Sequence, residues 1–351
     1  MPYSNYHTTS FLEALKDKDY VVQHFYFEEM PNFRKGEQWA SSGGTKIYWM
    51  SFFNFMLSVI RSDVVFFLGA IRPLPWQILL LTLSCLMRKR VFVASEGLKK
   101  RSFSKLIKAI FSVLSPHFTL LAMGKGCRGD FKRLGFNGRC LKFSFYENYP
   151  ELDHEINYNK YSAPIVRILL VGQLIKRKNF ELVLKSLRDY HGKKRIRVDI
   201  AGDGELLRKL SSIANDVTKN KNITVCFHGH VEAAALHDLF INATLFVCPS
   251  FYEGWGVVLN NALHYGLPIL ALDSVRSAEG YLVNDKVNGR ISTLDSFKDD
   301  LLKMIDSDLS SMSDNSFKLN EQWKLGVAKH RFIKIIQSNE QFTSGVFSKA
   351  V

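Results

Sequence analysis

Short apolar runs alternate with amphipathic stretches through the second half of the chain. The apolar runs predict buried strands, and the stretches between them, with apolar residues at helical spacing, predict helices. The predicted strands are 165–171, 197–201, 224–229, 245–248 and 269–272, and the predicted helices are 180–190, 205–216, 233–242 and 258–264. An alternation of this kind builds a parallel sheet with helices on both faces, so we expect a Rossmann-like α/β domain.

The first half carries the same alternation less regularly. Its predicted strands are 64–68, 91–94, 118–122 and 141–145, and its predicted helices are 76–87 and 103–114. The second of these helices has one apolar stripe, formed by Phe103, Leu106, Ile107, Ile110, Phe111 and Leu114. We expect this helix to pack on the sheet, although its flanking residues Lys105 and Lys108 also suit contact with a lipid surface.

The length of the chain and a polar linker predict two domains. A chain of 351 residues exceeds the size at which one hydrophobic core usually keeps growing. The stretch 147–164 is polar and contains two prolines, which suits a connection between domains. We expect an N-terminal Rossmann-like domain over 1–150, a second one over 151–323, and a C-terminal segment, 324–351, whose helix crosses back to the first domain with no strand after it.

Two apolar stretches, 47–60 and 76–87, fall short of the roughly 20 residues that a membrane-spanning helix needs. We interpret both as core helices. The five cysteines are widely spaced and form no Cys-x-x-Cys pair, which favours reduced, buried thiols in a cytosolic protein. The first residues also lack the basic start and apolar run of a signal peptide, so we expect a cytoplasmic location.

The net charge of +14 is concentrated in the first half of the chain. Between Arg61 and Lys142 there are sixteen Lys or Arg residues and three acidic residues. This excess indicates an anionic partner, such as a membrane surface, a phosphorylated lipid or a nucleic acid; a basic face that only keeps the protein soluble is the alternative. A membrane partner would place the protein peripherally on the cytoplasmic face of the inner membrane.

The segment 249–268 carries the most specific chemistry, and it reads PSFYEGWGVVLNNALHYGLP. It joins a predicted strand to a predicted helix. Gly254 and Gly256 let backbone N–H groups approach a ligand closely, and the N-terminus of the following helix favours an anion such as a diphosphate. A tight turn without any ligand would use the same two glycines.

This segment resembles the signature of glycosyltransferase family 4, the group 1 retaining glycosyltransferases. The pattern of the signature is P-S-x-x-E-G-F/W-G-x-x-x-x-E-A-x-x-x-G-x-P, and the matching residues are Pro249, Ser250, Glu253, Gly254, Trp255, Gly256, Ala262, Gly266 and Pro268. The resemblance implies a GT-B fold, in which two Rossmann-like domains face a central cleft and the second domain binds a nucleotide sugar.

The resemblance also implies roles for individual residues. Glu253 corresponds to the glutamate beside the hydroxyls of the donor sugar, and Asn261 stands where the family has a glutamate that contacts the ribose. An amide can still hydrogen-bond a ribose hydroxyl, but it lacks the charge-assisted bond of a carboxylate. The phosphate turn then comprises Gly254, Trp255, Gly256 and Val257.

Upstream segments extend the resemblance over about residues 165–291. The loop that starts at Gly172 is similar to the family's G-R-L-x-x-x-K-G, in which the Arg and Lys bind the diphosphate. Lys178 matches the Lys, Gln173 replaces the Arg, and we expect Arg177 to supply the missing cation. The stretch 227–231 matches F-x-G-x-V, which implies that His230 and Val231 lie near the nucleotide base.

Other candidate signals are weaker. Glu96 follows the predicted strand 91–94 and is a candidate for binding the donor or acceptor sugar, or else a surface carboxylate among lysines. Residues 124–129 spell G-x-G-x-x-G, but their position after several other elements makes an NAD-dependent oxidoreductase the less favoured interpretation. Two D-x-D triplets, at 17–19 and 306–308, do not follow a buried strand, so we expect no metal site and no required cofactor.

We therefore expect a retaining hexosyltransferase or a related enzyme of the glycosyltransferase class. Glu253, Lys178 and Glu96 are the catalytic candidates. The donor would be a UDP- or GDP-linked sugar, and the acceptor a glycan or a polyprenyl-diphosphate-linked glycan in the assembly of lipopolysaccharide, capsule or exopolysaccharide; no nucleic acid partner is expected. The alternative is a non-catalytic GT-B-like partner subunit, suggested by Gln173 and Asn261.

Overall fold

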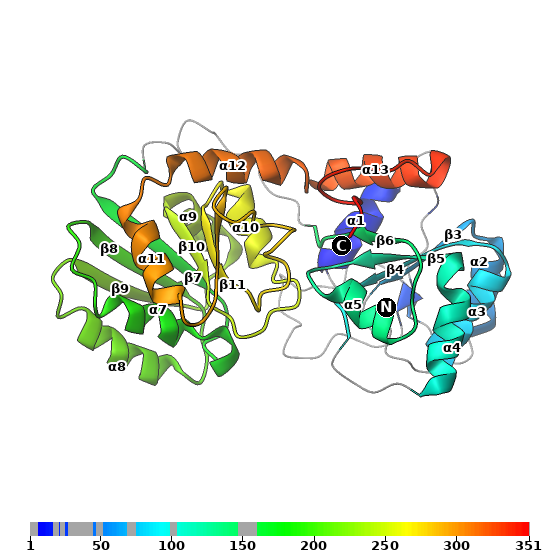
Figure 1. Ribbon diagram of the computed structural model, residues 1–351, viewed down its shortest axis with the longest axis horizontal. Coiled ribbons are helices and arrows are strands. Elements are labelled where there is room, and N and C mark those ends of the chain that lie inside the picture. Colours follow the sequence, from blue (N-terminus) through cyan, green and yellow to red (C-terminus); the bar gives the residue numbers. More distant parts are fainter. Residues whose placement is uncertain are drawn as a thin grey trace. The chain divides into compact units, whose positions relative to one another are not determined.

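A computed structural model describes residues 6–16, 21, 25–26, 45–46, 52–68, 75–98, 104–146 and 160–350. The chain divides into two compact units (Figure 1). The first unit comprises Met1–Asn148 together with Gln322–Val351, and the second comprises Tyr149–Glu321. Each unit is built around its own parallel sheet, which confirms the predicted α/β class with two Rossmann-like domains.

The sheet of the first unit has four strands, all parallel, in the order of the chain. They are β3 (Val64–Leu68), β4 (Arg90–Ser95), β5 (Phe118–Ala122) and β6 (Cys140–Lys142). Strands β1 (Phe25–Tyr26) and β2 (Thr45–Lys46) form a separate parallel pair. The predicted strands 64–68 and 118–122 are confirmed to the residue, whereas the predicted 141–145 is shorter in the structure.

Apolar side chains cover both faces of this sheet. On one face lie α3 (Pro75–Leu86), α4 (Lys105–Leu114) and α5 (Cys127–Arg133), each connecting consecutive parallel strands. Leu81, Phe111 and Phe131 from these helices share one core with Val91 and Val93 of β4. The short 3-10 turn η4 (Ser115–His117) links α4 to β5. The remaining helix before the sheet, α2 (Phe52–Arg61), directly precedes β3.

Aromatic rings fill the opposite face, where both ends of the chain meet. Helix α1 (Tyr6–Leu15) packs against α13 (Leu325–Ser338) (Figure 1). Phe332 of α13 lies 5.0 Å from Phe92, 5.5 Å from Phe66 and 5.4 Å from Phe11, measured between ring centroids. Such ring pairs add stabilisation to the burial of their area, so the first unit depends on residues from both ends of the chain.

Among the described residues no strand follows α13, as expected, but the tail still pairs with the edge strand β6 through an isolated bridge and backbone hydrogen bonds. Lys142 donates its backbone N–H to Ser348 O at 2.8 Å, and Phe347 donates to Lys142 O at 2.8 Å. Leu141 and Lys349 form an antiparallel bridge. This pairing was not predicted, because the stretch is too short to show a strand period, and its burial comes from Val346 and Phe347, which are fully buried.

The sheet of the second unit has six parallel strands. In spatial order they are β12 (Gly289–Ser292), β11 (Ile269–Leu272), β10 (Leu245–Cys248), β7 (Ile165–Val171), β8 (Arg195–Ala201) and β9 (Ile223–Gly229). The order reverses at β7, because β8 and β9 extend the sheet on one side and β10 starts its other side. In open α/β sheets, ligands bind outside the carboxyl ends of the strands at this switch point.

Helices pack on both faces of this sheet (Figure 1). They are α7 (Phe180–Leu187), α8 (Leu207–Val217), α9 (Ala233–Asn242), α10 (Val258–His264), α11 (Phe297–Asp306) and α12 (Ser310–Glu321). Helix α7 contacts both α8 and α11, and α10 contacts α12. The predictions for α9, α10, β10 and β11 are confirmed to the residue, whereas β12, α11 and α12 were not predicted.

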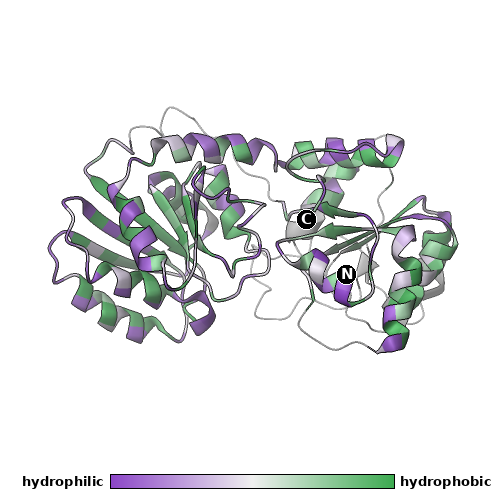
Figure 2. Cartoon of the chain, viewed as in Figure 1, coloured by the Kyte–Doolittle hydropathy of each residue, from purple (hydrophilic) through white to green (hydrophobic). Residues whose placement is uncertain are grey.

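Hydrophobic residues concentrate in the strands of both sheets, and the helices alternate between hydrophobic and hydrophilic residues (Figure 2). Among the described residues, no helix is both long enough and apolar enough to cross a bilayer.

Candidate active site

Two loops meet at the switch point of the second unit. The first follows β7 and contains the short 3-10 turn η5 (Lys176–Lys178), and the second is the segment 249–257 that follows β10. Phe251 donates its backbone N–H to Arg177 O at 2.9 Å, and Arg177 Nη1 donates back to Tyr252 O at 2.9 Å. These reciprocal bonds hold the two loops together although about 75 residues separate them in the sequence.

One carboxylate joins the two loops through a pair of cations. Lys178 Nζ donates to Glu253 Oε2 at 2.6 Å, and Arg177 Nη1 donates to the same oxygen at 2.8 Å. The hydroxyl of Ser250 adds a long hydrogen bond of 3.4 Å to this oxygen. We call Arg177, Lys178 and Glu253 the ion-pair cluster; it carries two positive charges and one negative charge, so it retains a net charge that suits an anionic ligand.

Burial strengthens the cluster. The side chains of Lys178 and Glu253 are 11% and 13% exposed, whereas that of Arg177 is 40% exposed. A buried ammonium must be paired, and Glu253 provides the partner in this structure. Arg177 therefore forms the part of the cluster that is more accessible to solvent.

Two glycines leave room for the side chains of the cluster. Gly172 has a φ of +146°, and a Cβ atom at this position would lie 2.9 Å from Cε of Lys178. Gly256 has a φ of +68°, and a Cβ atom there would lie 2.7 Å from Cγ of Glu253. Any larger residue would strain the backbone and displace the lysine or the glutamate.

The buried indole of Trp255 anchors the turn 254–257. Trp255 is 1% exposed, and its Nε1 donates to Oδ1 of Asn260 at 2.6 Å. Its ring also meets Tyr281 edge-on, with centroids 5.6 Å apart. Sequence reasoning did not single out Asn260. A usable signal was present, because the family pattern allows Phe or Trp at position 255. A Trp brings an N–H that needs an acceptor, and an amide follows five residues later.

The other side of the loop is fixed by the segment after β11. Glu253 forms a parallel bridge with Val275, and Arg276 donates its backbone N–H to Glu253 O at 3.2 Å. Ser274 Oγ donates to Ser250 O at 2.8 Å. Neither Ser274 nor Arg276 was a candidate from the sequence, because their contribution comes from tertiary contacts of a loop without a motif of its own.

The end of β10 carries a neutral thiol. Burial raises the pKa of Cys248 above its ordinary value, and the neighbouring Lys178 opposes this shift. The thiol donates to Ser250 Oγ at 3.8 Å. A thiol held in its protonated form is a poor nucleophile, so we assign Cys248 a packing role.

The remaining candidates lie outside the ion-pair cluster. Gln173 is exposed in the loop after β7, and Asn261 lies in α10 and is half-buried. His230 is exposed at the end of β9 next to Val231, and its Nε2 lies 3.6 Å from Glu232 Oε1. Glu96 belongs to the first unit, where it follows β4 and is half-buried. The structure thus brings Gly172, Arg177, Lys178 and the turn 253–257 together.

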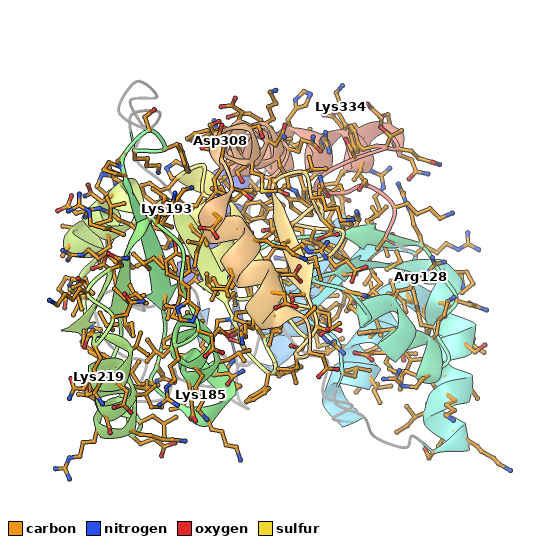
Figure 3. The ribbon with its side chains drawn as sticks, turned by 60° about the vertical axis from the view of Figure 1, so that its left-hand side comes forward. Arg128, Lys185, Lys193, Lys219, Asp308 and Lys334 are labelled. Atoms are coloured by element: carbon orange, nitrogen blue, oxygen red, sulfur yellow. The ribbon has the colours of Figure 1, made fainter. Side chains whose placement is uncertain are left out.

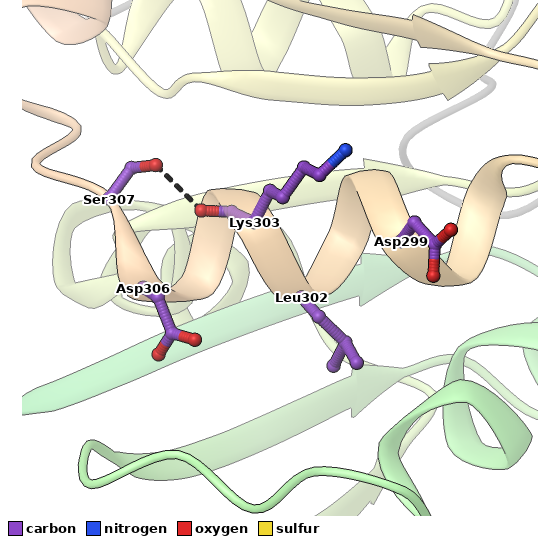
Figure 4. A pocket seen from close by; sticks show the side chains of 5 residues that line it. All are labelled: Asp299, Leu302, Lys303, Asp306 and Ser307. Carbon is purple, nitrogen blue, oxygen red and sulfur yellow. Dashed lines mark hydrogen bonds between the residues drawn. The ribbon is translucent and has the colours of Figure 1, made fainter.

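A separate hollow of about 440 Å³ runs along α11. Asp299, Leu302, Lys303, Asp306 and Ser307 line it (Figure 4). All five residues come from the outer side of this helix and its end, and none belongs to the ion-pair cluster. In the part of the chain that the structure describes, no group of three or more His, Cys, Asp or Glu side chains is placed to hold a metal ion.

Comparisons with known proteins agree with the architecture. Residues 162–323 match the family model of group 1 glycosyl transferases, which covers most of the second unit. Over 124 residues the chain is 27% identical to an uncharacterized glycosyltransferase of Methanocaldococcus jannaschii. This match covers 35% of the chain and 30% of the archaeal protein, so the chain aligns with less than one third of that relative.

Solved structures resemble the whole chain. The lipopolysaccharide outer core galactosyltransferase WaaB, in its apo form, superimposes with a TM-score of 0.65 at 15% identity, covering 95% of both chains. Anabaena HepE in complex with UDP superimposes with a TM-score of 0.59 at 14% identity, covering 81% of both chains. The fold is therefore GT-B, and together with the family match it supports a glycosyltransferase.

Proposed function

We propose that this protein is a retaining glycosyltransferase that transfers a sugar from a UDP- or GDP-linked donor to a glycan or a polyprenyl-diphosphate-linked acceptor. The observation that carries the proposal is the ion-pair cluster at the switch point of the second unit. Two cations, one of them nearly buried, lie beside a glycine turn, and Lys178 and Glu253 are two of the residues that the family resemblance singles out.

In this proposal Lys178 and Arg177 bind the diphosphate of the donor. When the bond between the anomeric carbon and the diphosphate oxygen breaks, negative charge develops on the leaving group, and the two cations stabilise it. Arg177 takes the place of the arginine that the family has at Gln173, because its guanidinium already reaches the cluster. Glu253 accepts hydrogen bonds from hydroxyls of the donor sugar and orients the ring.

Relatives support the donor class and the pathway. HepE binds UDP in its crystal structure, and WaaB is named as a lipopolysaccharide galactosyltransferase. By analogy we assign the protein to the assembly of a surface polysaccharide such as lipopolysaccharide, capsule or exopolysaccharide. Its place of action would be the cytoplasmic face of the inner membrane, to which the basic first half of the chain would attach it peripherally. The reaction needs no metal ion in this proposal.

A non-catalytic partner subunit is the second candidate, and the observation that favours it is Asn261 in α10. An amide at this position gives the ribose a weaker hydrogen bond than a carboxylate would, and Gln173 offers no charge to the diphosphate. A protein that binds its donor weakly could keep the GT-B fold for assembly with an active enzyme.

Transfer and donor-hydrolysis assays on the wild type, Glu253→Ala and Lys178→Ala distinguish the two candidates. We expect turnover by the wild type and a loss of at least about a hundredfold in both variants, as for the removal of a single charge-stabilising group. Lys303→Ala, which removes an exposed lysine from α11, is the matched control and should retain full activity. Equal absence of turnover in all four proteins, with every nucleotide sugar tried, would leave the partner-subunit function.

A further inference from the structure

Large apolar side chains are exposed on two neighbouring helices of the first unit. Leu79 and Leu86 of α3 are 50% and 71% exposed, and Leu106 and Val113 of α4 are each 71% exposed. Exposed apolar residues that gather on one surface indicate a binding partner, whereas single ones do not. We call these four residues the apolar ridge.

The fold places the four side chains on one surface. Strands β3, β4 and β5 are parallel, so the helices that connect them, α3 and α4, run in the same direction on the same face of the sheet. Residues seven apart lie above one another on a helix, about 10 Å apart. Leu79 and Leu86 therefore form one line on α3, and Leu106 and Val113 form a second line beside it on α4.

The inner sides of the same helices are fully occupied. Leu81 and Cys85 of α3 pack into the core with Phe111 and Leu114 of α4. The apolar stripe predicted for 103–114 is thus divided in the structure: Phe111 and Leu114 are buried, Ile107 and Ile110 are partly buried, and Leu106 points to solvent. Leu106 consequently has no packing role that would explain an apolar residue there.

Three exposed cations on or next to the same two helices have no carboxylate partner among the described residues. Lys105 and Lys108 on α4 and Arg88 after α3 are exposed, and within the described ranges none of the three forms an ion pair. Two exposed lysines of the second unit, by contrast, have acidic neighbours: Lys185 lies 2.6 Å from Glu181 and Lys219 lies 2.9 Å from Asp216 (Figure 3 labels both lysines). The cations around the ridge are therefore available to an external anion.

We propose that the apolar ridge and its cations dock on an anionic phospholipid bilayer. The four apolar side chains enter the boundary between headgroups and acyl chains, and Lys105, Lys108 and Arg88 pair with lipid phosphates. A second copy of this chain is a poorer occupant, because two surfaces that carry the same positive charge repel each other. The inference rests on the proposed membrane-linked function and names the surface responsible for attachment.

Sedimentation with lipid vesicles tests the proposal. We expect the wild type to bind vesicles of equal parts phosphatidylglycerol and phosphatidylcholine, to lose most of this binding at high salt, and to bind pure phosphatidylcholine weakly. The double variant Leu106→Gln/Val113→Gln keeps every charge and should bind the anionic vesicles about tenfold more weakly. The matched control, Val287→Gln/Leu294→Gln, removes two apolar residues that are 47% and 52% exposed on the second unit and should bind like the wild type.

Three outcomes would overturn the proposal. The first is no vesicle binding by the wild type, and the second is equal binding by the wild type and the ridge variant. The third is a wild type that forms an oligomer and does not bind vesicles, with the oligomer disrupted in the ridge variant. Both variants should retain the thermal unfolding temperature of the wild type, since the altered side chains are exposed. Activity on a water-soluble acceptor is measured in parallel: retained transfer with no vesicle binding refutes the ridge and leaves the proposed enzyme function intact.

Discussion

Glu253 pairs with the two cations to which the proposed diphosphate would bind, so a substitution of Glu253 tests the proposal directly. In the structure its Oε2 accepts from Lys178 at 2.6 Å and from Arg177 at 2.8 Å. A bound diphosphate would compete with this carboxylate for the same two donors. Glu253→Gln keeps the size and shape of the side chain but removes the charge, so we expect it to bind free UDP or GDP more tightly while it transfers sugar more slowly.

The magnitude follows from the bonds that compete. A hydrogen bond to a charged group contributes about 1.5–3 kcal/mol, and every 1.4 kcal/mol changes a dissociation constant tenfold. Arg177 is 40% exposed, so solvent screens its bond to Glu253, and we take the lower end of this range. The expected result is a dissociation constant for the nucleoside diphosphate that is about tenfold lower in Glu253→Gln, measured by isothermal titration calorimetry.

A matched control is available in the same unit. Glu181 also bridges two lysines, with Lys185 Nζ at 2.6 Å and Lys209 Nζ at 2.5 Å, but it does not contact the ion-pair cluster. Glu181→Gln should leave nucleotide affinity and turnover unchanged. Unchanged or weaker binding of both UDP and GDP by Glu253→Gln would refute the idea that carboxylate and diphosphate share these cations.

Three further predictions concern packing and titration. Asn260→Leu removes the acceptor of the Trp255 indole N–H and should cost about 1–3 kcal/mol in chemical denaturation, most of which Trp255→Phe in the same chain should restore. Phe332→Ala opens the aromatic core of the first unit and should cost about 3–5 kcal/mol, measured in the same way. Burial raises the pKa of Cys85 to about 11 and that of Cys140 to about 12. At pH 8 both thiols should therefore react far more slowly with a disulfide reagent than they do in the unfolded chain. Their reaction rate should rise only in strong alkali.

Each of these predictions has a contradicting result. Independent, additive effects of Asn260→Leu and Trp255→Phe would show that the hydrogen bond between them contributes nothing. A loss below about 1 kcal/mol for Phe332→Ala would show that the rings around it repack. Equal rates of modification at pH 8 for the folded and the unfolded protein would show that Cys85 and Cys140 are accessible.

Periodicity predicted the central strands of the second unit well because they are buried on both faces. Continuous apolar runs such as 245–248 and 269–272 have sharp ends, and each borders a glycine, proline or polar turn. Strand β12 (Gly289–Ser292) was not predicted, since Arg290 and Ser292 make it too polar for a buried run. Arg290 lies there because Asp300 of α11 accepts from its Nε at 3.0 Å, a tertiary contact that periodicity does not reveal.

The sequence predicted several residues of the candidate site but not the contacts between them. Motif register identified Lys178 and Glu253, and Arg177 became a candidate as the cation that could replace the arginine missing at Gln173. The direct pairing of all three, however, depends on two loops that meet only when β7 and β10 become neighbours in the sheet. Asn260 was overlooked because its role is to satisfy a buried group in the same turn, and that role requires knowing that Trp255 is buried.

The meeting of both chain ends in the first unit sets an order for biosynthesis. A ribosome synthesises residues 149–321 before Phe332 and Phe347, so strands of the second unit can pair while the first unit still lacks part of its core. Until α13 has been synthesised, Phe66 and Phe92 have no helix to cover them. The nascent first unit is therefore the part of this protein that should engage chaperones, and its completion requires joining segments across the whole intervening unit.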